Sequence, residues 1–270
     1  MQQDALCKHA AMGALGLFGA LLLVFGPAAV LFRVVAGTPV FVLAAVTSAA
    51  AYLLSLLLAA LPFRGAPWRA LLRSCMRQLT CARAVASLSE SAFVFPALLV
   101  ALVTQEAATR PLLWHGSKRA LAALNAVARE ERVRPTTRFD MLLLALALGL
   151  GHGLAHAAFF ALPLLALSGS SATLLMDRCP QMSLFSMTAA CTCAMVFMHA
   201  AAMPVAFYGW STKHRVYSAA PAVLHALATV ASVSSLASGG CVATVVLLWL
   251  LSAVQVLCAG SVALAVTARR

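Results

Sequence analysis

Charged residues are scarce in this chain. Only 10% of its 270 residues are Asp, Glu, Lys or Arg, and only 7 of them are acidic, whereas a soluble domain is about a quarter charged. The apolar share is 63%, above the roughly one half that is usual. This composition excludes a soluble enzyme, a disordered tail and a collagen-like chain, and it predicts an integral membrane protein.

Several catalytic signatures are also missing. The sequence holds no HExxH zinc motif, no GxSxG elbow and no P-loop. Its aspartates, Asp4, Asp140 and Asp177, all lie at or outside the ends of apolar runs. The chain alone is therefore not expected to be an aspartyl or metal-dependent intramembrane protease, and we predict no cofactor and no bound metal.

The apolar runs predict an all-α fold with seven transmembrane helices in a single membrane domain, residues 1–270. A helix needs about 20 apolar residues to cross the hydrocarbon core. The run from Val216 to Ala268 is long enough for two spans and breaks at the Ser/Gly-rich segment Ser232–Gly240. The first run is longer than the core of a usual signal peptide, so we interpret it as a retained helix. The predicted spans are 11–32, 39–61, 84–106, 140–167, 181–207, 216–236 and 241–266.

The basic residues predict the orientation. The net charge is +12, and the cations lie between apolar runs, so we expect them to face lipid headgroups rather than nucleic acid. Twelve basic residues share the side of the C-terminus and 7 share the side of the N-terminus. The positive-inside rule then predicts a cytosolic C-terminus and a lumenal or external N-terminus.

The longest polar segment, residues 108–138, is a basic cytosolic loop in this prediction. Leu113, Leu121, Leu124 and Ala128 fall close to one helical face. An amphipathic helix on the cytosolic leaflet would have this pattern, and an ordinary solvated loop is the alternative.

Four histidines lie in apolar segments: His152, His156, His199 and His225. Ionisable groups within the membrane are costly and point to a functional or a structural polar role. The spacing of His152 and His156 puts both on one helix face. The four imidazoles could bind a metal ion together, but no carboxylate or cysteine lies at ligand spacing, and we favour interhelical hydrogen bonds. Gln105 and Glu106, at the cytosolic edge of the third span, either bind a proton or ion, or hydrogen-bond within the bundle or at the headgroups.

Pro204 lies in the same apolar run as His199. Since proline has no N–H, the carbonyl of Ala200, four residues earlier, loses its helical donor. A histidine such as His225, or a water, is a candidate donor to this carbonyl, and a plain proline kink is the alternative reading.

Small residues recur every four positions in the fourth span, at Ala145, Gly149, Gly153 and Ala157. Such a stripe lets two helix backbones approach closely. It predicts one tightly packed helix partner, either within the chain or on another chain.

The eight cysteines fall into two groups. Cys191, Cys193, Cys241 and Cys258 lie within apolar runs, where cysteine behaves as a small buried hydrophobe. Cys7, Cys75, Cys81 and Cys179 would share the lumenal side and could oxidise there, with no pairing indicated by the sequence.

Four features together resemble the anterior-pharynx-defective (Aph-type) subunit of γ-secretase. The first is a series of short motifs over the first two spans, and the second is Gln105-Glu106 followed by a basic loop. The third is the stripe at Ala145, Gly149 and Gly153, similar to the family's GxxxGxxxG, and the fourth is the pair His199 and His225. The motifs of the first feature are Gly26-Pro27-Ala28, Leu31-Phe32, Ala36-Gly37-Thr38-Pro39 and Ser55-Leu56-Leu57-Leu58-Ala59.

The resemblance implies a non-catalytic scaffold that binds presenilin, nicastrin and the small presenilin-enhancer subunit, in the endoplasmic reticulum, the Golgi and endosomal membranes or the plasma membrane. It implies that Gln105, Glu106, His199 and His225 surround an internal polar pocket, and that Ala145, Gly149 and Gly153 are packing residues. The departures from the family pattern are Ala145 in place of the first glycine, the additional His152 and His156, the arginine-rich second loop and the extension before Met12. A small-solute or metal transporter that uses the intramembrane histidines is the alternative function.

Overall fold

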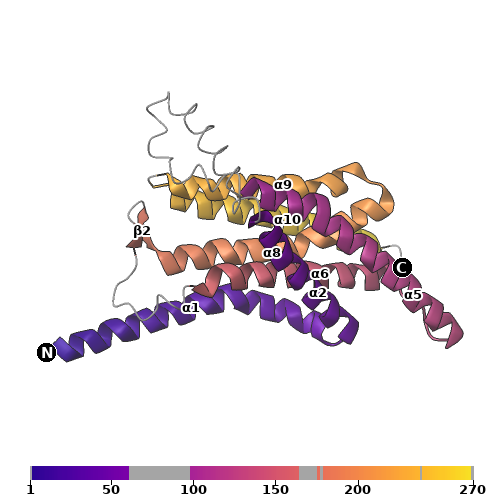
Figure 1. Cartoon of the computed structure of the whole chain (residues 1–270), viewed down its shortest axis with the longest axis horizontal. Coiled ribbons are helices and arrows are strands. Elements are labelled where there is room, and N and C mark those ends of the chain that lie inside the picture. Colours follow the sequence, from indigo (N-terminus) through magenta and orange to yellow (C-terminus); the bar gives the residue numbers. More distant parts are fainter. Residues whose placement is uncertain (1, 61–97, 164–174, 177–178, 238, 269–270) are drawn as a thin grey trace, which may run out of the picture.

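The computed structural model describes residues 2–60, 98–163, 175–176, 179–237 and 239–268. These residues are almost entirely helical (Figure 1). Six described helices are long and apolar enough to cross a membrane, and the chain is an integral membrane protein. These six are α1 (Gln2–Ala36), α2 (Pro39–Ala60), α6 (Arg138–Ala161), α8 (Leu184–Thr212), α9 (Arg215–Val233) and α10 (Gly240–Thr267).

The predicted third span, 84–106, lies largely outside the described residues. Its described end continues without a break from residue 98 through a π-helical turn, η3 (Thr104–Thr109), into α5 (Arg110–Glu130). The segment predicted as a basic loop is thus helical as far as Glu130, and only the stretch from Glu131 to Thr137 is not. Leu113, Trp114, Ser117 and Leu121 are buried on one face of α5, whereas Leu124, which the sequence placed on the apolar face, is exposed. α5 continues the preceding helix and is not a separate surface helix.

α6 and α8 form the centre of the bundle. α8 packs against α6, α1, α9 and α10, and α6 also packs against α2 and α1. Figure 1 shows α8 and α6 side by side between α1 and the pair α9 and α10. Because every side of these two helices meets another helix, both are mostly buried, whereas the outer helices expose apolar side chains such as Val30, Leu57 and Leu257, as a lipid-facing surface requires.

Local capping explains where the central helices begin. Thr137 and Asp140 form a reciprocal capping box at the start of α6, with Asp140 Oδ2 accepting the Thr137 N–H at 2.7 Å. Ser183 caps α8 by accepting the Ser186 N–H at 3.1 Å. These side chains satisfy backbone donors that a helix N-terminus leaves free.

One end of the bundle carries a β-hairpin that the sequence did not predict. Strand β1 (Leu175–Met176) pairs antiparallel with β2 (Cys179–Ser183) just before α8. The residues at 181–183, assigned to the fifth span, are therefore in a strand, and that helix begins at Leu184. At the same end α9 gives way to a short 3-10 turn, η4 (Ser234–Leu236), within the predicted Ser/Gly break.

Candidate functional site

The small-residue stripe of α6 lies against α8 of the same chain. A Cβ added at Gly149 would lie 2.6 Å from the carbonyl oxygens of both His199 and Ala200, and one added at Gly153 would lie 3.0 Å from that of Val196. Ala145 and Ala157 are fully buried. The sequence left open whether the stripe packs against a helix of the same chain or of another chain. In the structure its partner is α8 of the same chain, so the stripe is not a free docking surface.

The carbonyl of Ala200, which Pro204 deprives of its helical donor, lies beside Gly149. Without a Cβ, the glycine leaves this oxygen room next to the α6 backbone. His225, the donor suggested from the sequence, bonds to Glu106 instead.

Glu106 is the centre of a buried polar group formed by three residues. Its Oε1 accepts a hydrogen bond from His225 Nδ1 at 2.6 Å, and its Oε2 forms an ion pair with the Arg110 guanidinium. Arg110 is 1% exposed and is the largest fully buried side chain described. The prediction that Arg110 belongs to the basic loop is therefore wrong, because one turn of helix carries its side chain back to the buried carboxylate.

Gln105 and Glu106 lie within the π-helical turn η3, which directly precedes Arg110. A π turn inserts one extra residue and rotates the side chains that follow it. Gln105 is 4% exposed, and its Oε1 has no hydrogen-bond partner among the described residues. Both side chains thus lie within the bundle, since Glu106 contacts His225 of α9 there.

The four histidines lie together between α6, α8 and α9. The ring of His199 is 5.0 Å from that of His152, 5.2 Å from that of His156 and 5.0 Å from that of His225, measured between centroids. In the described part of the chain, the ring nitrogens of His152 and His199 have no hydrogen-bond partner. No set of three His, Cys, Asp or Glu side chains in that part is placed to hold a metal ion.

Tyr52 connects the histidines to α2. Its hydroxyl lies 2.9 Å from His156 Nδ1, and its ring packs edge-on against His152 with centroids 4.7 Å apart. α2 also approaches α6 closely at Gly151, where a Cβ would overlap the carbonyl of Ala45. In the sequence, these two contacts could have been suspected only from Tyr52, a lone tyrosine in an apolar run, and from Gly151, a glycine on another face of the helix than the stripe.

A cavity of about 310 Å³, which we call the polar cavity, lies next to these tyrosine and histidine side chains. Tyr52, Gln105, His156 and His225 line it in the middle of the bundle. Hydroxyl groups line it toward the α9–α10 turn, and the remaining wall is apolar. The hydroxyl-bearing residues are Thr188, Thr192, Thr229, Ser232, Ser235 and Thr244. Such an amphiphilic cavity can hold water or the end of a peptide or lipid chain, with the fixed imidazole, amide and hydroxyl groups as hydrogen-bond partners.

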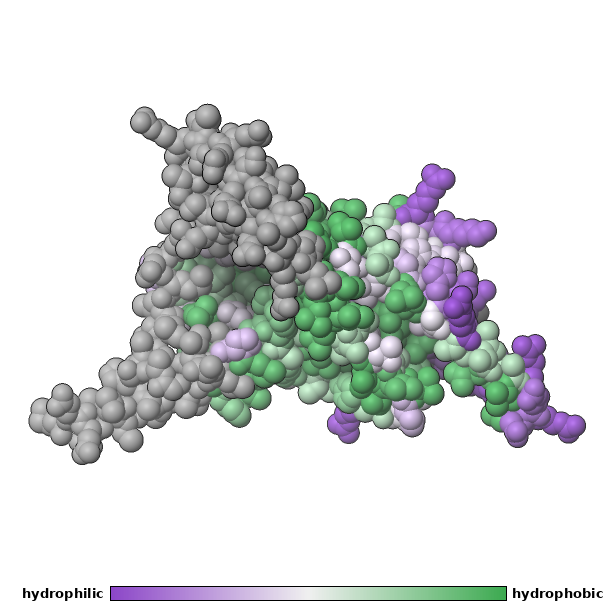
Figure 2. Space-filling view, viewed as in Figure 1, coloured by the Kyte–Doolittle hydropathy of each residue, from purple (hydrophilic) through white to green (hydrophobic). Residues whose placement is uncertain are grey.

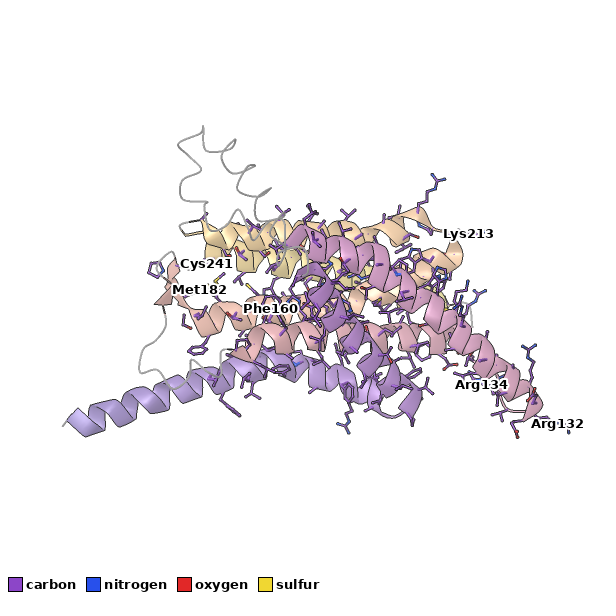
Figure 3. All side chains as sticks on the ribbon, in the orientation of Figure 1. Arg132, Arg134, Phe160, Met182, Lys213 and Cys241 are labelled. Atoms are coloured by element: carbon purple, nitrogen blue, oxygen red, sulfur yellow. A yellow bond between two sulfur atoms is a disulfide. The ribbon has the colours of Figure 1, made fainter. Side chains whose placement is uncertain are left out.

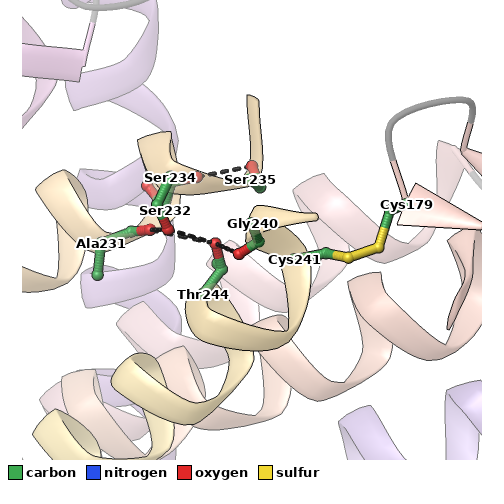
Figure 4. Close-up of a disulfide and its surroundings, with 8 residues drawn as sticks. All are labelled: Cys179, Ala231, Ser232, Ser234, Ser235, Gly240, Cys241 and Thr244. Carbon is green, nitrogen blue, oxygen red and sulfur yellow. Dashed lines mark hydrogen bonds between the residues drawn. A yellow bond between two sulfur atoms is a disulfide. The ribbon is translucent and has the colours of Figure 1, made fainter. Parts of the chain in front are cut away.

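A disulfide between Cys179 and Cys241 joins the hairpin to the first turn of α10 (Figure 4). The prediction that Cys241 is a free buried thiol is therefore wrong, because the hairpin brings Cys179 to the start of α10. Cys7, Cys75 and Cys81 lie outside the residues whose side chains are described. Beside the disulfide, Thr244 Oγ1 donates to the carbonyl of Gly240 at 3.0 Å and lies 2.7 Å from Ser234 Oγ, which fixes the α9–α10 turn.

Comparison with known proteins identifies the family. Residues 15–265 match the family described as Aph-1 protein. A similar relative is "Gamma-secretase subunit APH1-like" from Arabidopsis thaliana, which is 34% identical over 165 residues. That alignment covers 60% of this chain and 65% of the relative, so this chain spans less than two thirds of the relative's length. Because the family match extends over nearly the whole chain, from within the first helix to the end of the last, the protein belongs to the Aph-1 family.

Proposed function

We propose that this protein is a non-catalytic scaffold subunit of a γ-secretase-type intramembrane protease. The observation that carries the proposal is the family match over residues 15–265, together with a relative named as a γ-secretase subunit. In this proposal the chain binds presenilin, nicastrin and the presenilin-enhancer subunit, supports their assembly and presenilin maturation, and leaves peptide-bond cleavage to presenilin.

The two ends of the bundle differ in a way that supports the predicted orientation. The disulfide and the hairpin lie at one end, and disulfides persist in oxidising compartments. Lys213, Arg132 and Arg134 lie at the other end, where hydrophilic residues gather (Figures 2 and 3), as expected for a cytosolic face. We therefore propose a lumenal N-terminus, seven spans including the one at 84–106, and a cytosolic C-terminus, within the membranes of the secretory and endosomal system.

The buried groups have two roles in this proposal. Ala145, Gly149 and Gly153 hold α6 against α8 and so maintain the shape that partners recognise. Gln105, Glu106, His199 and His225 form the polar interior of the bundle, where the hydrogen bond between His225 and Glu106 joins α9 to η3. Buried polar groups provide little net stability but specify one arrangement of helices.

Affinity purification tests the proposal. The tagged chain is expressed in cells that lack their own Aph-type subunit, extracted in mild detergent, and analysed for bound proteins and for presenilin endoproteolysis. We expect the three partners to co-purify and presenilin maturation to be restored. Recovery of the folded chain without presenilin would refute the scaffold role.

The matched variants in this experiment are His225→Ala and Gly260→Leu. His225→Ala leaves Glu106 without its histidine partner and should reduce the amount of complex, whereas Gly260 has open space around it and its variant should assemble normally. The transporter alternative is measured with the isolated chain in vesicles, where it alone predicts solute or metal uptake that is lost in His199→Ala.

A further inference from the structure

A second cavity lies at the proposed cytosolic end, where α5, the end of α8 and the start of α9 meet. Its volume is about 500 Å³, which falls in the usual range of small-molecule sites, about 300–1,000 Å³. Its walls carry Trp114 and Trp210, and Lys213 and Arg215 line it from the α8–α9 junction. We call it the basic cavity. It shares no lining residue with the polar cavity near the histidines.

Among the residues described, no acidic side chain lines the basic cavity. Within the described residues, neither Lys213 nor Arg215 forms an ion pair with a carboxylate, and both are exposed. Lys118 lies over the Trp114 ring, 5.5 Å from its centroid, and adds a third positive charge at the edge. Positive charges that converge on a concave surface without acidic partners attract an anionic group from outside the chain.

The backbone at the α8–α9 junction places the two main cations. α8 ends at Thr212, the next residue, Lys213, has a left-handed backbone with φ 56°, and α9 begins at Arg215. The tight reversal brings both side chains to the same cavity.

Aromatic residues mark the depth of the basic cavity. Trp114 and Trp210 pack with ring centroids 6.0 Å apart, and Tyr208, His214 and Tyr217 form a second cluster at the α8–α9 junction. Tryptophan and tyrosine concentrate at the level of the lipid headgroups. In the proposed orientation we therefore expect the cations of the basic cavity near the depth of the lipid phosphates.

From these observations we propose that the basic cavity binds the headgroup of a phosphoinositide in the cytosolic leaflet. The phosphomonoesters lie between Lys213 and Arg215, and the inositol ring packs on the indole face of the cavity. Basic pockets between transmembrane helices on the cytoplasmic side are suited to such headgroups, and a cavity of about 500 Å³ is larger than one phosphate requires. The assignment to the cytosolic leaflet rests on the proposed orientation, but the binding itself does not.

The test uses the purified full chain in neutral detergent, titrated against a fluorescent short-chain phosphatidylinositol bisphosphate and followed by anisotropy. In Lys213→Gln/Arg215→Gln, affinity should fall roughly thirtyfold, since each cation near a lipid phosphate contributes a factor of about five. The matched control is Arg132→Gln/Arg134→Gln, which removes the same charge at the same end of the bundle. Arg132 also has a left-handed backbone, with φ 54°, and neither arginine lines the basic cavity. The control should bind as the unmodified chain does.

Competition separates the possible ligands. Soluble inositol phosphate headgroup should displace the probe, and short-chain phosphatidylserine or inorganic phosphate should do so only at much higher concentration. Equal competition by phosphatidylserine or by inorganic phosphate would overturn the phosphoinositide assignment, as would equal loss in the two double variants. If the double variant loses its helical circular dichroism, the single variants are measured instead. Each of Lys213→Gln and Arg215→Gln is expected to bind roughly fivefold more weakly. The conservative Lys213→Arg is expected to bind normally.

Discussion

Replacing Gly149 with alanine tests whether the contact between α6 and α8 determines stability. The new methyl carbon would lie 2.6 Å from two backbone carbonyl oxygens, those of His199 and Ala200, whereas such a contact needs about 3.3 Å. Neither oxygen belongs to a side chain that can rotate away, so the two helices must separate by roughly 0.7 Å at this point.

The magnitude follows from two opposing effects. Overpacking a rigid interior costs about 1–3 kcal/mol, and the better helix propensity of alanine offsets up to about 1 kcal/mol. We therefore expect Gly149→Ala to lower the free energy of unfolding by about 0–2 kcal/mol relative to the unmodified chain, and by about 1–3 kcal/mol relative to an alanine placed at an uncrowded helical glycine. The change at Gly153 should cost less, because its nearest atom is 3.0 Å from the added Cβ. The change at Gly260 should raise the free energy of unfolding by up to about 1 kcal/mol, because no atom lies within 4 Å of the added Cβ and only the helix propensity of alanine acts there.

The assay is unfolding of the purified chain in mixed detergent micelles with increasing dodecyl sulfate, followed by circular dichroism. The three alanine variants are compared with the unmodified chain, and the expected order of stability is Gly260→Ala, then Gly153→Ala, then Gly149→Ala. If Gly149→Ala unfolds at the same dodecyl sulfate fraction as Gly260→Ala, the reasoning from backbone contact is refuted.

Three further changes test the polar contacts and the disulfide with the same unfolding assay. Tyr52→Phe removes the hydroxyl that lies 2.9 Å from His156, and we expect a loss of about 0.6–1.5 kcal/mol; no loss would show that this contact is energetically neutral. Glu106→Ala leaves a buried arginine without its carboxylate and should cost about 3–5 kcal/mol, which would be seen as strongly reduced yield, whereas normal yield and stability would contradict the buried ion pair. Cys179→Ser removes a disulfide between residues 62 positions apart and should lower the free energy of unfolding by about 2–4 kcal/mol. Cys258→Ser, which changes a free thiol, should unfold as the unmodified chain does. Equal stability of the two variants would argue against the disulfide.

Membrane insertion and the helical class were predictable because both depend on composition and run length alone. A backbone in hydrocarbon must satisfy its own hydrogen bonds, so long apolar runs become helices. The Ser/Gly break between the last two helices was equally readable, and Gly239 there adopts a positive φ of 72°, as glycine readily does. The hairpin before α8 was not, since its strands are very short and their pairing is set by the disulfide and the helix ends around them.

The sequence by itself determined the stripe of small residues and the set of unusual polar residues in the membrane, because spacing along one helix and the cost of burying an ionisable group are local properties. Only the tertiary structure decided what each of them meets. It turned the stripe toward α8, carried Arg110 back into the interior through a π-helical turn, and joined Glu106 to His225 across 119 positions of the chain. Such pairings depend on how whole helices rotate and cross, and no local pattern in the sequence records those angles.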